Sequence, residues 1–133
     1  MNDSSNLVIY SQAEFLAEQK KFNEAAVEYK KLADKQQAFV LRSFSAISYA
    51  EMMIAIDNYN EAISVLENVS SEGEKNIYAD KAVYLLGKIN QYGLKNFNKA
   101  EEYYQKLLAD FPKSIYADDS RTEILILQNK PES

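Results

Sequence analysis

The apolar residues of this chain recur every three or four positions, the spacing that gathers them on one face of a helix. The clearest case is Phe97-Asn98-Lys99-Ala100, which recurs as Phe22-Asn23-Glu24-Ala25 and as Tyr59-Asn60-Glu61-Ala62. Larger apolar residues follow each alanine at the fourth and seventh positions: Tyr29, Leu32, Leu66, Val69, Tyr104 and Leu107. The copies lie 37 and 38 residues apart. The pattern therefore predicts an array of one repeated helical unit.

The same pattern predicts a single all-α domain over 1–133, built from helix pairs. The expected pairs lie at about 6–36, about 38–70 and about 76–111, with a closing helix at about 114–129. Asn23, Asn60 and Asn98 are the expected N-caps of the second helices, because an Asn side chain accepts a bond from an unpaired helix amide. Gly93 is expected to form a left-handed cap after the fifth helix, with Leu94 folding back onto it.

A second repeated word marks the end of the chain. Ile77-Tyr78-Ala79-Asp80 recurs as Ile115-Tyr116-Ala117-Asp118 at a spacing of 38, with Ser114 in the place of Asn76. The closing helix is therefore the first half of an unfinished fourth unit. Such half-units cover the last apolar face of a stack.

Composition limits the chemistry that the chain can perform. It has 133 residues, 47% of them hydrophobic, and no His or Cys. Catalytic triads, Cys-His pairs, common zinc sites and a neutral-pH imidazole base are thus excluded. Adjacent acids such as Asp118-Asp119 and Glu101-Glu102 point in different directions on a helix and read as solvated. No cofactor, metal or catalytic residue is predicted, and a carboxylate-based enzyme domain is kept as the rival hypothesis.

Charge and hydropathy bear on partners and compartment. The net charge is −5 with Lys and Arg scattered among acids, which disfavours nucleic acid. No apolar run approaches the roughly 18 residues of a membrane span, so membrane insertion is not expected. Residues 1–6 lack the features of a secretory signal. The expected compartment is the cytoplasm for a complete chain, and the periplasm or envelope for part of a longer exported protein.

The repeated unit resembles the tetratricopeptide repeat. The third unit carries most of that pattern, in Leu86, Gly87, Phe97, Ala100, Tyr104 and Pro112. The first two units match at Ala13, Phe22, Ala25, Tyr29, Ala50, Tyr59, Ala62 and Leu66. The resemblance implies a right-handed α-solenoid of three helix pairs plus a capping helix. The stretch 107–117 is similar to bacterial envelope proteins of this class.

Two features depart from the family pattern. The usual period is about 34 residues, shorter than the spacing found here. The interval from Leu86 to Ala100 is one residue longer than the consensus, which leaves the register of the preceding helix open.

The resemblance implies a non-catalytic scaffold that binds a peptide or helix in a concave groove lined by the first helix of each unit. The corresponding residues here are Tyr10, Glu14, Glu18, Phe44, Ile47, Glu51, Lys81, Tyr84 and Lys88. An equal alternative is that these side chains pack against neighbouring helices. The terminal-carboxylate clamp of chaperone-binding members is not expected, because only Lys88 supplies a base at the matching places. A structural spacer, or the C-terminal part of a larger envelope protein, is a further alternative, and homo-oligomerisation is left open.

Overall fold

The computed structural model describes residues 3–34 and 39–129, and within these ranges it contains helices and no strand. The predicted all-α fold class is confirmed. The seven α-helices are α1 (Asp3–Glu18), α2 (Phe22–Ala33), α3 (Phe39–Ala55), α4 (Tyr59–Ser71), α5 (Ala79–Lys88), α6 (Phe97–Asp110) and α7 (Ala117–Gln128). A 3-10 turn, η1 (Gly73–Lys75), precedes α5, and a π-helical turn, η2 (Ile89–Gly93), follows it.

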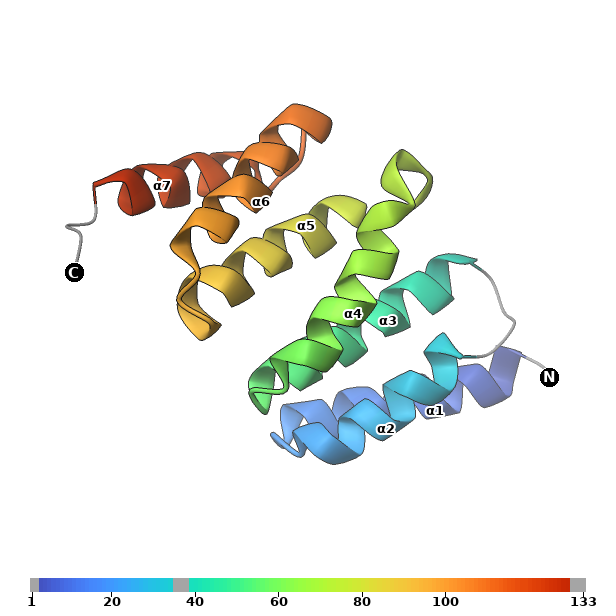
Figure 1. Cartoon of the computed structure of the whole chain (residues 1–133). Helices are drawn as coiled ribbons and strands as arrows, with labels where there is room; N and C mark the ends of the chain where they lie inside the picture. The colour runs from blue at the N-terminus through green and yellow to red at the C-terminus, as the bar shows by residue number, and fades with distance from the viewer. Residues whose placement is uncertain (1–2, 35–38, 130–133) are drawn as a thin grey trace.

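The helices form a linear array in which each α-helix packs against its neighbours in sequence. Figure 1 shows α1 with α2, α3 with α4 and α5 with α6 following one another from the N-terminus to the C-terminus. α7 lies against α6 at the end of the array. The helical-repeat architecture expected from the sequence is thus present, while the repeat limits given above stay a prediction.

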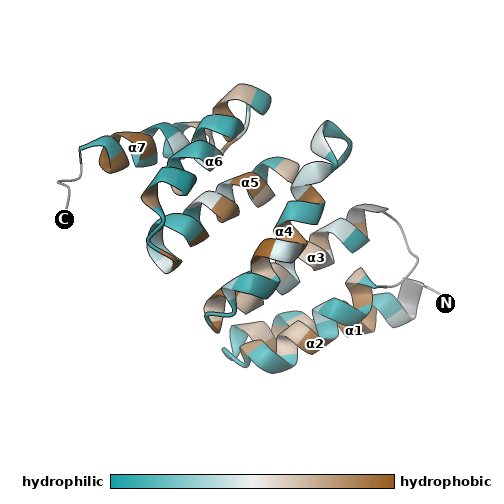
Figure 2. Ribbon diagram, in the orientation of Figure 1, coloured by the Kyte–Doolittle hydropathy of each residue, from teal (hydrophilic) through white to brown (hydrophobic). Residues whose placement is uncertain are grey.

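The repeated alanines lie in the core of the array. Ala25, Ala62 and Ala100 are all fully buried, as expected for a small residue where two helices approach closely. The larger residues that follow each alanine on the same helix face are also buried: Tyr29, Leu32, Leu66, Val69, Tyr104 and Leu107. Figure 2 shows the opposite, outward surface of α6 as largely hydrophilic. The sequence-predicted core face of the second helices is confirmed.

The predicted N-caps lie two residues too late. α2, α4 and α6 begin at the aromatic residue of each repeated word, so that the capping residues are Lys21, Asn58 and Asn96. The Asn96 side chain accepts a bond from the Lys99 amide at 3.3 Å, and the other two make no side-chain cap bond. Asn98 therefore lies inside the first turn of α6.

Tight turns explain this early start. Lys20 and Asp57 adopt left-handed backbone conformations, with φ of 62° and 61°. The next amide reaches back five residues: Lys21 N donates to Leu16 O at 2.9 Å, and Asn58 N donates to Met53 O at 2.8 Å. This is the Schellman closure of a helix, here built without glycine.

The turn between α5 and α6 accommodates the extra residue that the sequence contains between Leu86 and Ala100. Lys95 has the left-handed conformation, with φ of 58°, and the Asn96 amide donates to Asn90 O at 2.7 Å, six residues back. The additional residue widens the last turn of the first helix into η2, rather than lengthening the loop. The register that the sequence left open is thus set by a π-helical turn.

Gly93 does not form the expected left-handed cap. Its φ is not positive, and Leu94 is 46% exposed instead of folding back onto the helix. A β-carbon on Gly93 would lie 2.8 Å from Tyr59 Cζ. The close approach of the Tyr59 ring, rather than the backbone conformation, therefore favours glycine at this position.

Hydrogen bonds at equivalent positions join consecutive units. Asn76 Nδ2 donates to Ser43 Oγ at 3.1 Å, and Ser114 Oγ donates to Asp80 Oδ2 at 2.6 Å. Asn76 Oδ1 and Ser114 Oγ also accept the backbone amides two residues ahead, at 2.9 and 3.0 Å. Ser114 thus takes the place of Asn76, as the second repeated word predicts.

Candidate functional site

The first helices of the array carry a row of aromatic rings. Tyr10 on α1 and Phe44 on α3 have ring centroids 5.7 Å apart, and Tyr78, just before α5, lies 5.7 Å from Phe44. All three side chains are half-buried. The rings support one another by tilted packing while part of each surface faces solvent. We call the residues predicted to line the groove, together with the rings that contact them, the first-helix face.

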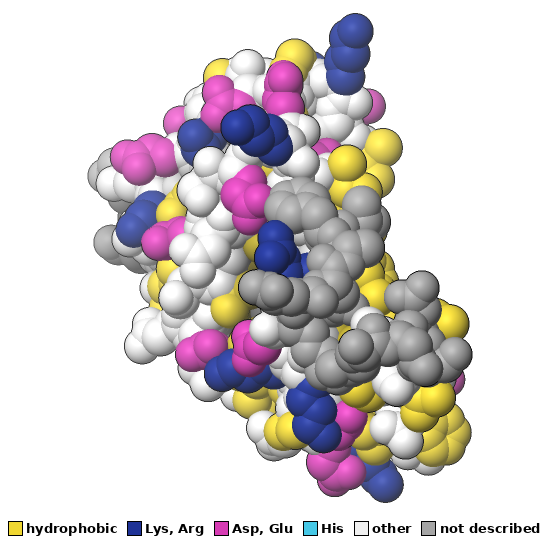
Figure 3. All heavy atoms as spheres, turned by 90° about the vertical axis from the view of Figure 1, so that its right-hand side faces the viewer, with side chains coloured by type: hydrophobic (Ala, Val, Ile, Leu, Met, Phe, Trp, Pro, Cys, Tyr) yellow, Lys and Arg dark blue, Asp and Glu magenta, His cyan; other side chains and the backbone are white. Residues whose placement is uncertain are grey.

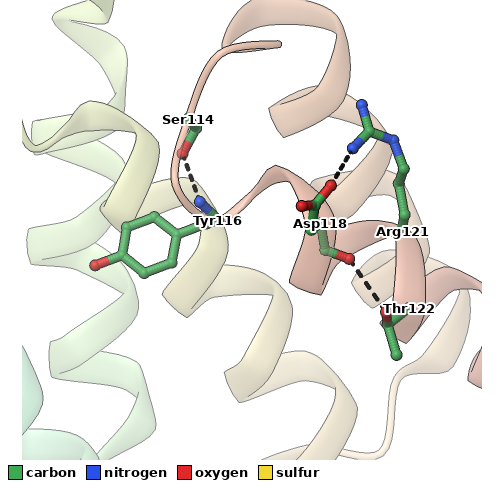
Figure 4. Close-up of polar contacts among 5 residues, drawn as sticks. All are labelled: Ser114, Tyr116, Asp118, Arg121 and Thr122. Carbon is green, nitrogen blue, oxygen red and sulfur yellow. Dashed lines mark hydrogen bonds and ion pairs between the residues drawn. The ribbon is translucent and has the colours of Figure 1, made fainter.

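A second ring pair lies toward the end of the array. The rings of Tyr84 and Tyr116 are stacked, with centroids 4.7 Å apart and planes at 19°. Figure 4 shows the Tyr116 ring pointing from the loop before α7 toward the preceding helices, away from Asp118. Tyr84 also lies 6.1 Å from the Tyr104 ring. Tyr84 is therefore engaged in packing on two sides.

Tyr78 and Tyr116 were missed as candidate site residues. The signal that could have found them is the second repeated word, which places a tyrosine before both α5 and α7. Because each tyrosine precedes its helix, counting along helical positions alone could not assign it to the first-helix face.

Acidic residues edge the aromatic row. Glu14 accepts a hydrogen bond from the Tyr29 hydroxyl at 2.5 Å, and Glu51 pairs with Lys81 at 3.4 Å, which joins α3 to α5. Burial and the neighbouring Glu14 carboxylate raise the pKa of Tyr10 and of Tyr29. The hydroxyls thus stay protonated and remain hydrogen-bond donors at neutral pH.

Lys88 lies between two tyrosine rings. Its ammonium group is 5.5 Å from the Tyr84 centroid and 4.8 Å from the Tyr92 centroid, within range of a cation–π contact. The Tyr92 hydroxyl donates to Glu123 Oε2 at 2.7 Å, and this bond raises the pKa of Tyr92 to about 12. Tyr84, Lys88 and Tyr92 border a pocket of about 290 Å³ that is also lined by Tyr59. Tyr59 and Tyr92 were not among the sequence candidates.

Two sequence candidates lie apart from the aromatic row. Ile47 is only 1% exposed and belongs to the hydrophobic core, so it presents no surface to a ligand. Glu18 is exposed at the last turn of α1. The other candidates are half-buried and take part in the ring contacts, hydrogen bonds or ion pair described above, or lie beside them.

The acidic side chains of the array lie at its surface. No Asp or Glu side chain within 5–34 and 41–129 is buried, and the described residues include no group of three potential ligands that could hold a metal ion. Asp118 is exposed and pairs with Arg121 at 2.7 Å, as Figure 4 shows. On the side of the molecule in Figure 3, acidic and basic side chains are interspersed. Within 3–34 and 39–129, no helix is long and apolar enough to cross a membrane.

One comparison with known proteins identifies the repeat. Residues 81–114 match the family model of the tetratricopeptide repeat, a stretch that covers most of α5, all of η2 and α6, and the following loop. No curated protein matches the chain. Tetratricopeptide repeats generally mediate protein–protein interactions and are typically non-catalytic. The further resemblance to bacterial envelope members stays a prediction. This match identifies residues 81–114 as a tetratricopeptide repeat within an array of successive helix pairs.

Proposed function

We propose that the chain is a scaffold that binds a peptide or helix of a partner protein on the first-helix face. The observation that carries this proposal is the aromatic row of Tyr10, Phe44 and Tyr78. These rings come from two helices and one turn that are far apart in sequence. They nevertheless lie next to one another and keep solvent-facing surface.

Aromatic side chains are well suited to anchor a partner. Each offers a large contact area for the loss of few rotamers, and anchors of this kind dominate measured binding energies. The mutual ring contacts hold Phe44 between Tyr10 and Tyr78 before any partner arrives. Such preorganisation lowers the entropic cost of binding.

Charge favours a partner with basic residues. Glu14 and Glu51 edge the row, and of these two only Glu51 is paired with a lysine, Lys81. Exposed charges of this kind steer association more than they strengthen it. Their contribution should fall with added salt, because screening acts beyond about 8–10 Å at ordinary ionic strength.

The two alternative functions, an enzyme domain and a structural spacer, require other structural features than a scaffold does. A carboxylate-based enzyme needs a desolvated acid facing a second one, and the acids within 5–34 and 41–129 are all at least partly exposed. A structural spacer needs no exposed anchor. The half-exposed aromatic row therefore favours the scaffold.

The test is capture of a partner from an extract of the source cell, with the wild type and two variants in parallel. Tyr10→Ala removes the end of the row, where the Tyr10 ring packs against Phe44. Val27→Ala removes an exposed apolar side chain of α2 and is the matched control. We expect a protein that the wild type and the control retain and that Tyr10→Ala loses, with unchanged circular dichroism.

Hydrogen exchange of the captured complex then locates the contact. Protection of α1, α3 and the start of α5 is expected. Protection confined to α2, α4 and α6, or equal retention by all three proteins, would overturn the proposal.

A further inference from the structure

One residue of the second repeated word is exposed in both of its copies. In both copies, Ile77–Asp80 and Ile115–Asp118, the alanine is buried and the tyrosine ring packs against another aromatic ring. Asp80 accepts a hydrogen bond, and Asp118 forms an ion pair. The isoleucine differs, since 64% of Ile77 and 84% of Ile115 is exposed. Single exposed apolar side chains are common on protein surfaces, so the exposure of Ile115 needs no partner. Ile77 differs because it borders a groove with further apolar side chains.

Ile77 borders a groove of about 570 Å³, between the start of α5 and the loop after α6. Phe111 and Pro112 provide the apolar part of the opposite wall. A neighbouring hollow of about 560 Å³ shares Glu74, Asp110 and Phe111 with it, so that the depression continues past Phe111. Its size is within the range of sites that hold small ligands or side chains.

Hydrogen bonds fix the two walls relative to each other. Ser114 Oγ donates to Asp80 Oδ2 at 2.6 Å and accepts the Tyr116 amide at 3.0 Å. Asp80 Oδ1 accepts the Lys81 amide at 2.8 Å. The loop after α6 is thus tied to α5, and the groove is formed before a ligand binds.

The groove carries more acid than base. Glu74, Asp80 and Asp110 border it, and Lys113 is its one lysine. Lys106 lies in the neighbouring hollow but is paired with Asp110 at 3.0 Å. Glu74 is exposed, and within the described part of the chain it makes no ion pair. An occupant that combines apolar and positively charged side chains complements this surface.

We propose that this groove binds an extended segment of a partner protein in which an apolar side chain is followed by Lys or Arg. The apolar side chain would pack between Ile77 and Phe111, and the basic group would lie near Glu74 and Asp110. The groove shares no residue with the first-helix face. It is therefore a second interaction surface, beyond the proposed function.

The test uses a short capped peptide of alternating leucine and lysine, and a matched peptide of alternating leucine and glutamate. Each is titrated into the isotope-labelled full chain, with amide shifts recorded by nuclear magnetic resonance. The lysine peptide should shift amides of 74–80 and 110–114. Ile77→Ser should weaken its binding about five-fold or more, because the apolar contact is lost.

Ile115→Ser is the matched control. It removes the same exposed residue of the same repeated word, at a place that does not border the groove. Affinity should stay within about two-fold of the wild type. This control separates a specific contact from general attraction between a basic peptide and a chain of net charge −5.

Several results would overturn the inference. These are equal binding of the glutamate peptide, equal loss in the two serine variants, and shifts at Tyr10 and Phe44 in place of the groove. The last result would leave the proposed function standing. Concentration-dependent self-association that Ile77→Ser abolishes would assign the groove to a second copy of the chain and also contradict the proposal.

Discussion

Gly87 lies directly beneath the ring of Tyr104. A β-carbon on Gly87 would stand 2.6 Å from Tyr104 Cε1, closer than side-chain carbons pack. The ring cannot move aside, because Tyr104 is fully buried and its hydroxyl donates to the buried Gln91 Oε1 at 2.7 Å. Packing between α5 and α6, rather than backbone conformation, therefore requires glycine at this position.

Gly87→Ala should destabilise the protein by about 1–3 kcal/mol, the usual cost of overpacking a core. Gly93→Ala is the comparison. Its β-carbon would meet the Tyr59 ring at 2.8 Å, but that ring is only half-buried and its hydroxyl contacts the exposed Asp57. Tyr59 can yield, so the loss should be smaller. Equal denaturant midpoints for the two variants would contradict this account.

Ser120→Ala should stabilise the protein by about 1 kcal/mol, because the hydroxyl is buried without a hydrogen-bond partner. The equivalent position one unit earlier is Ala82, which is also fully buried, so alanine fits this place. Ser45, a further unit back, has the same orphan hydroxyl and should respond alike. Denaturant unfolding measures the free energy of unfolding of both variants.

Ser43→Ala is the control for these substitutions. Its hydroxyl accepts the bond from Asn76 Nδ2, and removal would leave that buried amide unpaired. We expect a loss of about 1–3 kcal/mol. A gain in stability here as well would show that the serine hydroxyls are unfavourable whatever their partners.

The sequence was sufficient for the helix faces and insufficient for the ring contacts. Ala25, Ala62 and Ala100 could be predicted as core because only a small residue fits repeatedly where two helices touch. Ile47 could not be separated from Phe44, since both lie on the same helix stripe. Packing of the neighbouring helices alone decides which one is buried.

The extra residue before Ala100 could be predicted only in part from the sequence. Counting against the consensus revealed it, yet counting cannot say whether an insertion lengthens a loop or widens a helical turn. The structure places it in η2, where the backbone bond from Asn96 to Asn90 spans one residue more than its counterparts. The ring pairs, by contrast, depend on rotamers and on the angles between helices, which no local pattern specifies.

Stability should fall as the pH rises above about 10, the value at which tyrosine ionises in an unfolded chain. The hydrogen bond to Glu123 raises the pKa of Tyr92 to about 12, and burial raises the pKa of Tyr29 and of Tyr104. Between about pH 10 and 12 the folded state therefore binds more protons than the unfolded state, and folding loses free energy with each increment of pH.

Denaturant unfolding at successive pH values, with tyrosinate absorbance as a second signal, measures this effect. Tyr104→Phe is the control, since it removes one such group and should make the decline less steep. A decline of the same steepness in both proteins would show that Tyr104 does not contribute to it and would contradict this account.

The stack of Tyr84 on Tyr116 predicts that the two rings act as a pair. Tyr84→Ala and Tyr116→Ala should each destabilise the protein, because both side chains are half-buried and in contact at 4.7 Å. The double variant should lose less than the sum of the single losses, by about 0.5–1.5 kcal/mol, the usual coupling of an aromatic pair. A double-mutant cycle in denaturant gives this number directly.

The same cycle decides what Tyr84 contributes to partner binding. A coupling of that size means that Tyr84 holds the loop before α7 in place. Removal of Tyr84 would then weaken partner binding through disorder of this loop as well as through the lost contact. Tyr84→Phe separates the two effects. It keeps the stacked ring, so that both the stability of the protein and its binding of the partner should be unchanged. Additive losses in the cycle would instead leave the Tyr84 ring free to anchor a partner by itself, like Tyr10 at the other end of the face.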